Sequence, residues 1–253
     1  MADASYNWAN KDTRAKIANT HTLEMILNYT SEIDNSLRET VVYGYPDREP
    51  LAVPDWQAVE TETAVIEGDS VSALEPNCAV LNFASYKHPG GGFMSGSRAQ
   101  EECLCHASFL YNVLEEFEDT YYAWNNQHLN RGLYLNRGLY TPNIQFDKMT
   151  ANVITVAAPN YGTASRYQNV TKEENDEVLR LRIKFILDIA CENHNEVLIL
   201  GAYGCGVFKQ DPMTVATIFK EELANYTCFK KVIFPIPTDR DLANYEAFKE
   251  VFG

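Results

Sequence analysis

Several features that would assign a sequence to a broad class at once are missing from this chain of 253 residues. The N-terminal stretch has no apolar segment of the kind found in secretory signals. No apolar run approaches the ~18 residues that a membrane span requires. The six cysteines include no Cys-x-x-Cys pair. We therefore expect a protein that is not secreted, has no membrane partner and keeps reduced, buried thiols. The expected location is the cytoplasm or, in a eukaryote, the cytoplasm or the nucleus.

Clusters of basic residues are also missing. The chain has 21 Lys and Arg against 35 Asp and Glu, which gives a formal net charge of −14. General nucleic-acid binders present a basic face, because most of their affinity comes from neutralising phosphates. We expect no general nucleic-acid binding. Any bound phosphate should be held locally by backbone N–H groups.

Motifs for metals and common nucleotide cofactors are absent as well. Cys103-x-Cys105 with His106 has a spacing that suits tetrahedral zinc poorly, and no second ligand cluster accompanies it. Neither G-x-G-x-x-G nor G-x-x-x-x-G-K-[ST] occurs. We expect neither a metal nor a cofactor.

Strand-like and helix-like segments alternate from residue 60 onward. "NCAVLNFAS" is a near-continuous apolar run, which is typical of a strand buried on both faces. The alternation predicts an α/β domain with a mostly parallel sheet covered on both faces. Residues 1–60 are expected to form a helical extension packed on this core, and residues 61–253 the main domain.

Capping signals place two of the expected helices. Ser97, with Gln100 three residues later, predicts a capping box for a helix over residues 98–116. Asp211 followed by Pro212 predicts the start of another helix. The tandem "LNRGLYLNRGLY" (129–140) is too short for a solenoid repeat and is interpreted as a hairpin or loop without assigned function.

Two glycine-rich segments follow predicted strands. Gly90-Gly91-Gly92 comes after "AVLNF", and residues 201–208 come after "EVLIL". Ligands of open α/β sheets bind beyond the carboxyl ends of the strands. Glycine lets the backbone approach a ligand closely, so two such loops on neighbouring strands could clamp a diphosphate. Glycine triplets can also be plain turns.

Three polar residues, Gln100, Glu101 and Glu102, follow the first glycine loop. They could simply be helix-capping residues with favourable acids in the first turn. Residues 101 and 102 project about 100° apart on a helix, so one can face a cleft while the other braces it. A carboxyl beside a bound diphosphate stays protonated through like-charge repulsion, as a general acid in glycoside cleavage must be.

The stretch "PGGGFMSGSRAQEE" resembles the GGG-x(6–8)-QEE signature of the poly(ADP-ribose) glycohydrolases. "VITVAAPNYG" and "VLILGAYGCGVFKQDPMTVATIF" resemble the microbial branch of that family in order and spacing. The resemblance implies a macrodomain-like fold that binds ADP-ribose. This fold is a three-layer α/β/α sandwich with a mixed, mostly parallel sheet, here with the N-terminal helical extension.

The resemblance also implies residue roles. Glu102 would be the catalytic general acid/base, and Glu101 would hold ribose hydroxyls. Asp69 would meet the adenine amino group. Ser85 stands where an asparagine is usual, and Lys209-Gln210 stands where Gly-Asn is expected. The implied substrate-binding residues are Asp69, Ser85, Gly90, Gly91, Gly92, Gln100, Gly204, Cys205, Gly206, Val207 and Phe208.

The implied activity is hydrolysis of ribose–ribose O-glycosidic bonds in poly(ADP-ribose), with ADP-ribose as product. Three alternatives remain open from the residues. One is a mono-ADP-ribosyl hydrolase acting on modified protein or nucleic acid. Another is a non-catalytic ADP-ribose-binding macrodomain. The third is an α/β domain that binds some other nucleotide.

Overall fold

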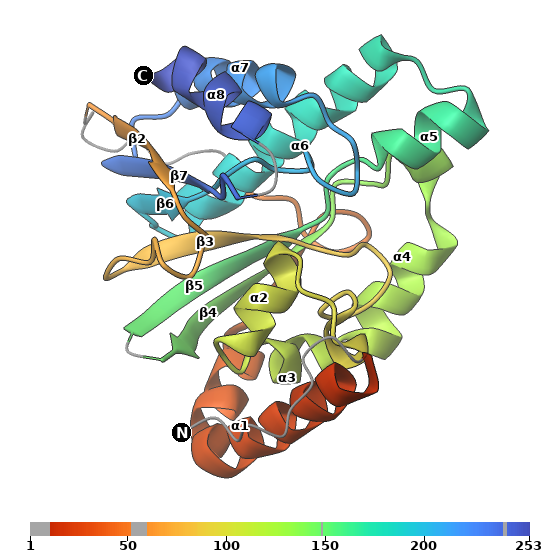
Figure 1. Cartoon of the computed structure of the whole chain (residues 1–253), viewed down its shortest axis with the longest axis vertical. Helices are drawn as coiled ribbons and strands as arrows, with labels where there is room; N and C mark the ends of the chain where they lie inside the picture. The colour runs from red at the N-terminus through yellow and green to blue at the C-terminus, as the bar shows by residue number, and fades with distance from the viewer. Residues whose placement is uncertain (1–10, 52–59, 148, 240–241) are drawn as a thin grey trace.

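The computed structural model describes residues 11–51, 60–147, 149–239 and 242–253. A single sheet runs through the middle, with helices on both of its faces (Figure 1). No helix among these residues is long and apolar enough to cross a membrane. The α-helices and strands in chain order are α1 (Lys11–Glu39), β1 (Val41–Tyr43), β2 (Glu62–Glu67), β3 (Cys78–Phe83), α2 (Gln100–His106), α3 (Leu110–Glu115), α4 (Ala123–Gln127), β4 (Gly138–Phe146), β5 (Met149–Val156), α5 (Tyr161–Gln168), α6 (Lys172–Glu192), β6 (Val197–Ile199), α7 (Pro212–Leu223), β7 (Lys231–Ile236) and α8 (Leu242–Phe252).

The sheet has seven strands in the order β1-β4-β5-β3-β6-β7-β2. The pairs β5–β3, β3–β6, β6–β7 and β7–β2 are parallel. The pairs β1–β4 and β4–β5 are antiparallel. The mixed, mostly parallel sheet expected from the sequence is therefore confirmed.

The central strand β3 is buried on both faces, as its apolar run predicts. Ala79 and Leu81 pack into the cluster beneath α6 and α7, and Cys78 and Val80 into the cluster beneath α1, α2 and α3. Alternate side chains point to opposite faces because a strand repeats every two residues. Burying a side chain the size of Leu81 stabilises the fold by about 1.5–3 kcal/mol, so the two clusters hold the three layers together.

The N-terminal segment packs on the same body. Ala18 of α1 is buried, and Met25 and Ile33 lie against the cluster that α2 and α3 share. After α1, the strand β1 pairs with β4 and forms an edge of the sheet. The domain boundary at residue 60 stays a prediction, and β1 brings residues from before it into the sheet.

The prediction of one helix over residues 98–116 is wrong. Two helices, α2 and α3, replace it, and the residue before the first helical turn is Ala99 instead of Ser97. The interruption has a local cause at Ser108. Its hydroxyl donates to Leu104 O (2.8 Å) and accepts from Leu110 N (3.1 Å), so it competes with the regular backbone ladder.

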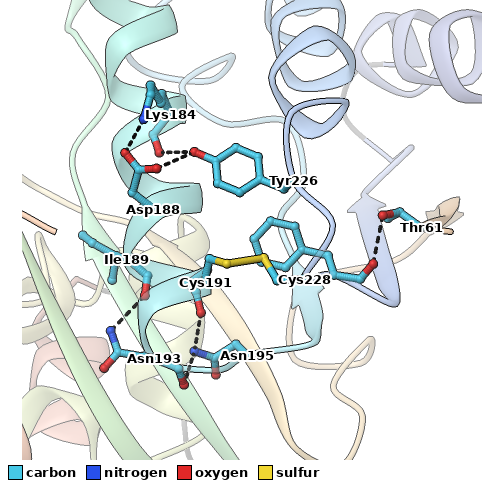
Figure 2. The surroundings of a disulfide bond; sticks show 11 residues. Thr61, Lys184, Asp188, Ile189, Cys191, Asn193, Asn195, Tyr226 and Cys228 are labelled. Carbon is cyan, nitrogen blue, oxygen red and sulfur yellow. Dashed lines mark hydrogen bonds and ion pairs between the residues drawn. A yellow bond between two sulfur atoms is a disulfide. The ribbon is translucent and has the colours of Figure 1, made fainter. Parts of the chain in front are cut away.

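The expectation of reduced thiols is wrong for one pair. Cys191 and Cys228 form a disulfide that joins the end of α6 to the segment before β7 (Figure 2). Their Cα atoms are 6.2 Å apart, a usual separation for a bridged pair. Figure 2 also shows Tyr226 beside the bridge, with its hydroxyl donating to Asp188 Oδ1 at 2.6 Å. Four cysteines are free, namely Cys78, Cys103, Cys105 and Cys205.

Candidate functional site

Both glycine-rich segments lie at the same edge of the sheet. β3 and β6 are parallel neighbours, so their carboxyl ends lie side by side. Gly90–Gly92 follow the first strand and residues 201–208 the second. This is the position at which open α/β sheets bind their ligands. The expected juxtaposition of two loops on neighbouring strands is confirmed.

The first loop is closed by its own hydrogen bonds. Gly91 N donates to His88 O (3.1 Å), and Phe93 N donates to Gly90 O (3.0 Å). Gly90 and Gly91 have φ values of 60° and 59°, a left-handed conformation that glycine adopts without strain. Two of the loop's N–H groups therefore already serve to shape it. The expected contact of Gly90, Gly91 and Gly92 with a diphosphate stays a prediction.

Glu102 lies in the first turn of α2 and is held by backbone donors. Its side chain is only 6% exposed. Oε1 accepts from Gly92 N and Oε2 from Ala99 N, each at 2.8 Å. The first bond ties the carboxylate to the glycine loop, and the second closes the start of the helix. The residue is therefore a helix-capping side chain that also contacts the glycine loop, and its catalytic role stays a prediction.

Glu101 is buried even more deeply, at 3% exposure. Its Oε2 accepts from Ser85 N at 2.7 Å and its Oε1 from Asn82 Nδ2 at 3.2 Å. Burial raises the pKa of Glu101 to about 8, the nearby charge of Glu102 adds to the rise, and the two hydrogen bonds offset only part of it. Glu101 therefore carries a proton at neutral pH.

Two further predicted residues serve the architecture around these carboxyls. The Gln100 side chain accepts from Phe83 N (2.8 Å) and donates to Leu81 O (2.8 Å) and Ser70 Oγ (3.0 Å). It fastens α2 to the end of β3. The Ser85 hydroxyl accepts from His88 N at 3.2 Å within the turn that leads to the glycine loop. Direct contacts of Gln100 and Ser85 with a ligand stay predictions.

The second loop turns sharply and leaves its tip exposed. Gly204 has a φ of +76°, and a Cβ there would lie 2.8 Å from Gln210 Cγ and 2.9 Å from Ala158 Cβ. Gly206 has open space around it, and Val207 is 78% exposed. Within the described part of the chain, the N–H groups of these two tip residues donate to no protein acceptor. They remain available to a ligand, whereas Cys205 N already donates to Ala202 O at 3.2 Å.

An aromatic stack connects the two loops. Tyr134 stacks on Tyr86, which lies just before the first loop, with ring centroids 4.2 Å apart. Tyr134 also contacts Phe208 of the second loop. These two rings meet edge-on, with their centroids 6.1 Å apart. Sequence reasoning missed Tyr134, because it lies within the duplication to which no role was given. An aromatic residue repeated in that tandem was the available signal.

The buried amide Asn82 was also missed. It is 0% exposed and links Glu101 to Thr155 Oγ1, to which its Nδ2 donates at 3.3 Å. A single polar residue inside the apolar run of β3 was the signal for it.

Asp69 belongs to a different part of the fold from Glu101 and Glu102. It follows β2 at the far edge of the sheet and accepts from Ser72 N at 2.8 Å, and its contact with adenine stays a prediction. Among the described residues, no cluster of His, Cys, Asp and Glu could hold a metal.

Comparison with known proteins identifies the family. The family model for the catalytic domain of microbial-type poly(ADP-ribose) glycohydrolase (PARG) matches residues 7–148, more than half of the chain. The chain belongs to the microbial-type PARG family. The matched residues include the first glycine loop and both glutamates, and the second loop lies beyond them.

Solved PARG structures are similar to this chain over most of its length, including residues beyond those that the family model matches. The PARG of Thermomonospora curvata is 28% identical over 95% of this chain and 100% of its own, with a TM-score of 0.80. Its complex with the inhibitor ADP-HPD gives 27% identity over 94% and 99% of the two chains, and a TM-score of 0.79. The PARG of Deinococcus radiodurans in complex with ADP-ribose is 28% identical over 87% of this chain and 96% of its own, with a TM-score of 0.74. No curated protein matches the chain.

Proposed function

We propose that this PARG-family chain hydrolyses the ribose–ribose O-glycosidic bonds of poly(ADP-ribose) and releases ADP-ribose, with Glu102 as the general acid/base. The observation that carries the proposal is the convergence of two buried carboxyls on one loop glycine. A Cβ built on Gly91 would lie 2.7 Å from Glu102 Oε1 and 2.8 Å from Glu101 Oε2. Both carboxyls therefore lie against the same glycine of the first loop.

In the proposed reaction, Glu102 gives a proton to the leaving ribose oxygen while the distal ribose gains oxocarbenium character. The resulting carboxylate then accepts a proton from the attacking water. Hydrogen bonds from Gly92 N and Ala99 N, at 2.8 Å each, hold the charged group in place between these steps. Glu101, protonated at neutral pH through its raised pKa, can donate a hydrogen bond to a ribose oxygen and so position the sugar.

The loops have separate tasks in this proposal. The exposed N–H groups at Gly206 and Val207 approach the diphosphate, and Phe208 packs against the substrate. Gly90, Gly91 and Gly92 line the diphosphate and the distal ribose. The substrate contacts expected from the family resemblance are completed by Gln100, Ser85, Gly204, Cys205 and Asp69. A cytoplasmic location remains part of the proposal.

Incubation of the protein with purified poly(ADP-ribose), with product analysis by anion-exchange chromatography, tests the function. We expect ADP-ribose to accumulate from polymer. Mono-ADP-ribosylated peptides serve as the comparison substrate. Polymer left intact while the peptides are cleared would contradict the proposal and favour a mono-ADP-ribosyl hydrolase. Binding of ADP-ribose without any product would favour a non-catalytic reader.

A further inference from the structure

A hollow lies on the α1 side of the first glycine loop. Its volume is about 230 Å³. It forms where the first turns of α1 meet the loop before α2 and the end of α2 itself. None of the residues that line it has a role in the proposed reaction. They are Arg14, Ile17, His21, Gly96, Arg98 and His106.

The hollow concentrates positive charge in a protein whose net charge is −14. Two guanidinium groups, Arg14 and Arg98, and two imidazoles, His21 and His106, come from three segments of the chain. The described lining residues include no carboxylate. Burial, followed by the charges of Arg98 and His21, lowers the pKa of His106. An anion in the hollow would relieve this mutual repulsion.

The side chains in the hollow also have donors to offer. Arg14 Nε is buried and has no hydrogen-bond partner in the described part of the chain. Leaving a buried donor without an acceptor is costly, so an acceptor brought by a ligand would be favoured there. His21 Nε2 lies 2.9 Å from Ser108 O. A carbonyl only accepts, so Nε2 carries the hydrogen in this bond.

The hollow and the carboxyls share one short segment. Gly96, with a φ of +74°, lets α1 approach so closely that a Cβ there would lie 2.2 Å from Arg14 Cβ. The next residue, Ser97, lies against Gly92, whose added Cβ would come within 2.8 Å of Ser97 Cβ. Two residues further on, Ala99 N donates to Glu102. A substrate with its scissile bond at Glu102 therefore has the hollow next to it.

We propose that this hollow, formed by Arg14, His21, Arg98 and His106, binds a phosphate group of the ADP-ribose unit next to the terminal one. The inference rests on the proposed function and adds a second contact point for the polymer. Mono-ADP-ribosylated substrates have no such neighbouring unit, so the hollow favours polymer over single modifications. The hollow also explains how a protein with a strongly negative net charge can bind a polyanion. The electrostatic attraction to phosphate is confined to this one local site.

Steady-state kinetics on poly(ADP-ribose) of defined length tests the polymer contact. In Arg14→Gln we expect KM for polymer to rise about tenfold or more, as loss of a charged hydrogen bond implies. The turnover number and the affinity for free ADP-ribose should stay within about twofold. KM should also depend less steeply on salt, because one phosphate contact is lost. Arg14→Lys should recover part of the effect through its charge.

Arg38→Gln is the matched control, since Arg38 lies in the last turn of the same helix and is exposed. It should leave every parameter unchanged. An Arg14→Gln enzyme with unchanged KM for polymer would overturn the inference. So would an equal loss of affinity for free ADP-ribose, since the hollow would then belong to the terminal-unit site. Wild-type protein that releases no ADP-ribose would instead overturn the proposed function, and the polymer assignment with it.

A binding measurement independent of turnover completes the test. Inorganic pyrophosphate is titrated into the wild-type protein while the five histidines are followed by ring-nitrogen NMR. We expect the His21 and His106 signals to move and that of His194, which follows α6, to stay. Arg14→Gln should weaken this response. Unmoved His21 and His106 signals at millimolar pyrophosphate would overturn the inference.

Discussion

Gly91 lies directly against the Glu102 carboxyl: a Cβ added to Gly91 would come within 2.7 Å of Glu102 Oε1. Real Cβ atoms do not approach an oxygen so closely, so the loop and the helix fit together only while residue 91 has no side chain. The φ of +59° at Gly91 imposes the same restriction through the backbone. The glycine is thus required by the packing of the protein itself, before any ligand is considered.

Gly91→Ala should therefore displace both carboxyls. We expect the free energy of unfolding to fall by about 1–2 kcal/mol from the left-handed backbone alone, with the clash adding to this. Release of ADP-ribose from polymer should fall by at least about 100-fold, because the general acid would be misplaced. Urea unfolding and product release, measured on the same preparation, check the two effects.

Gly206→Ala is the contrasting change in the second loop. Nothing lies within 4 Å of a Cβ built there. We expect stability to stay within about 0.5 kcal/mol, as for an exposed substitution. The affinity for ADP-ribose should nevertheless fall, because the methyl group would block the backbone from the diphosphate. Calorimetric titration with ADP-ribose measures it. Wild-type affinity in Gly206→Ala would argue against a diphosphate contact at this residue.

Glu102→Gln separates binding from chemistry. We expect turnover of polymer to fall by at least about 100-fold while ADP-ribose affinity is retained. The amide can satisfy only one of the two N–H donors that now bind Glu102, so stability should also fall by about 1–3 kcal/mol. Glu116→Gln, an exposed change at the end of α3, provides the control. Full activity in folded Glu102→Gln would remove this residue from the mechanism.

Stability should depend on pH through Glu101. Burial raises its folded-state pKa from 4.5 to about 8, so the folded protein binds this proton more tightly than the unfolded chain. Its contribution to the free energy of unfolding is fully present below pH 4.5 and is lost as the pH rises through about 8. Urea unfolding between these pH values should show the decline.

Glu101→Gln is the control for this effect and should flatten the pH dependence. The amide stays neutral, and Asn82 Oδ1, which has no partner in the described part of the chain, can accept from it. Parallel pH profiles for wild type and Glu101→Gln would show that another group causes the decline.

The Cys191–Cys228 disulfide should stabilise the protein measurably. The two residues are 37 positions apart, and closing a loop of that length contributes about 3–4 kcal/mol. We expect a reductant to lower the urea midpoint of the wild-type protein. The double variant Cys191→Ser, Cys228→Ser should unfold at the lower midpoint and be indifferent to reductant. A reductant effect that persists in the double variant would have to come from another cysteine pair.

Local patterns predicted the parts of the fold that depend on local chemistry. The apolar run of β3 correctly indicated burial on both faces. Asp211 caps α7 as expected, since its Oδ1 accepts from Thr214 N at 2.8 Å. The interruption at Ser108 was missed, because hydrophobic spacing continues across it. A hydroxyl that bonds the backbone leaves no trace in that spacing.

Contacts between distant segments could not be read from the sequence. The disulfide depends on β6 and β7 being neighbours, which brings the end of α6 to the start of β7. The placing of Tyr134 between two loops likewise depends on the finished fold. For the site, the glycines and glutamates were found from a motif, whereas Asn82 and Tyr134 needed the structure.

The stack of Tyr86 and Tyr134, with Phe208 at its edge, has a bearing on affinity. Because one ring supports both loops, their spacing is set when the chain folds. The entropy of arranging the two loops is then lost during folding, and an arriving nucleotide does not have to supply it. In the proposed function, the two loops are thus preorganised for the nucleotide.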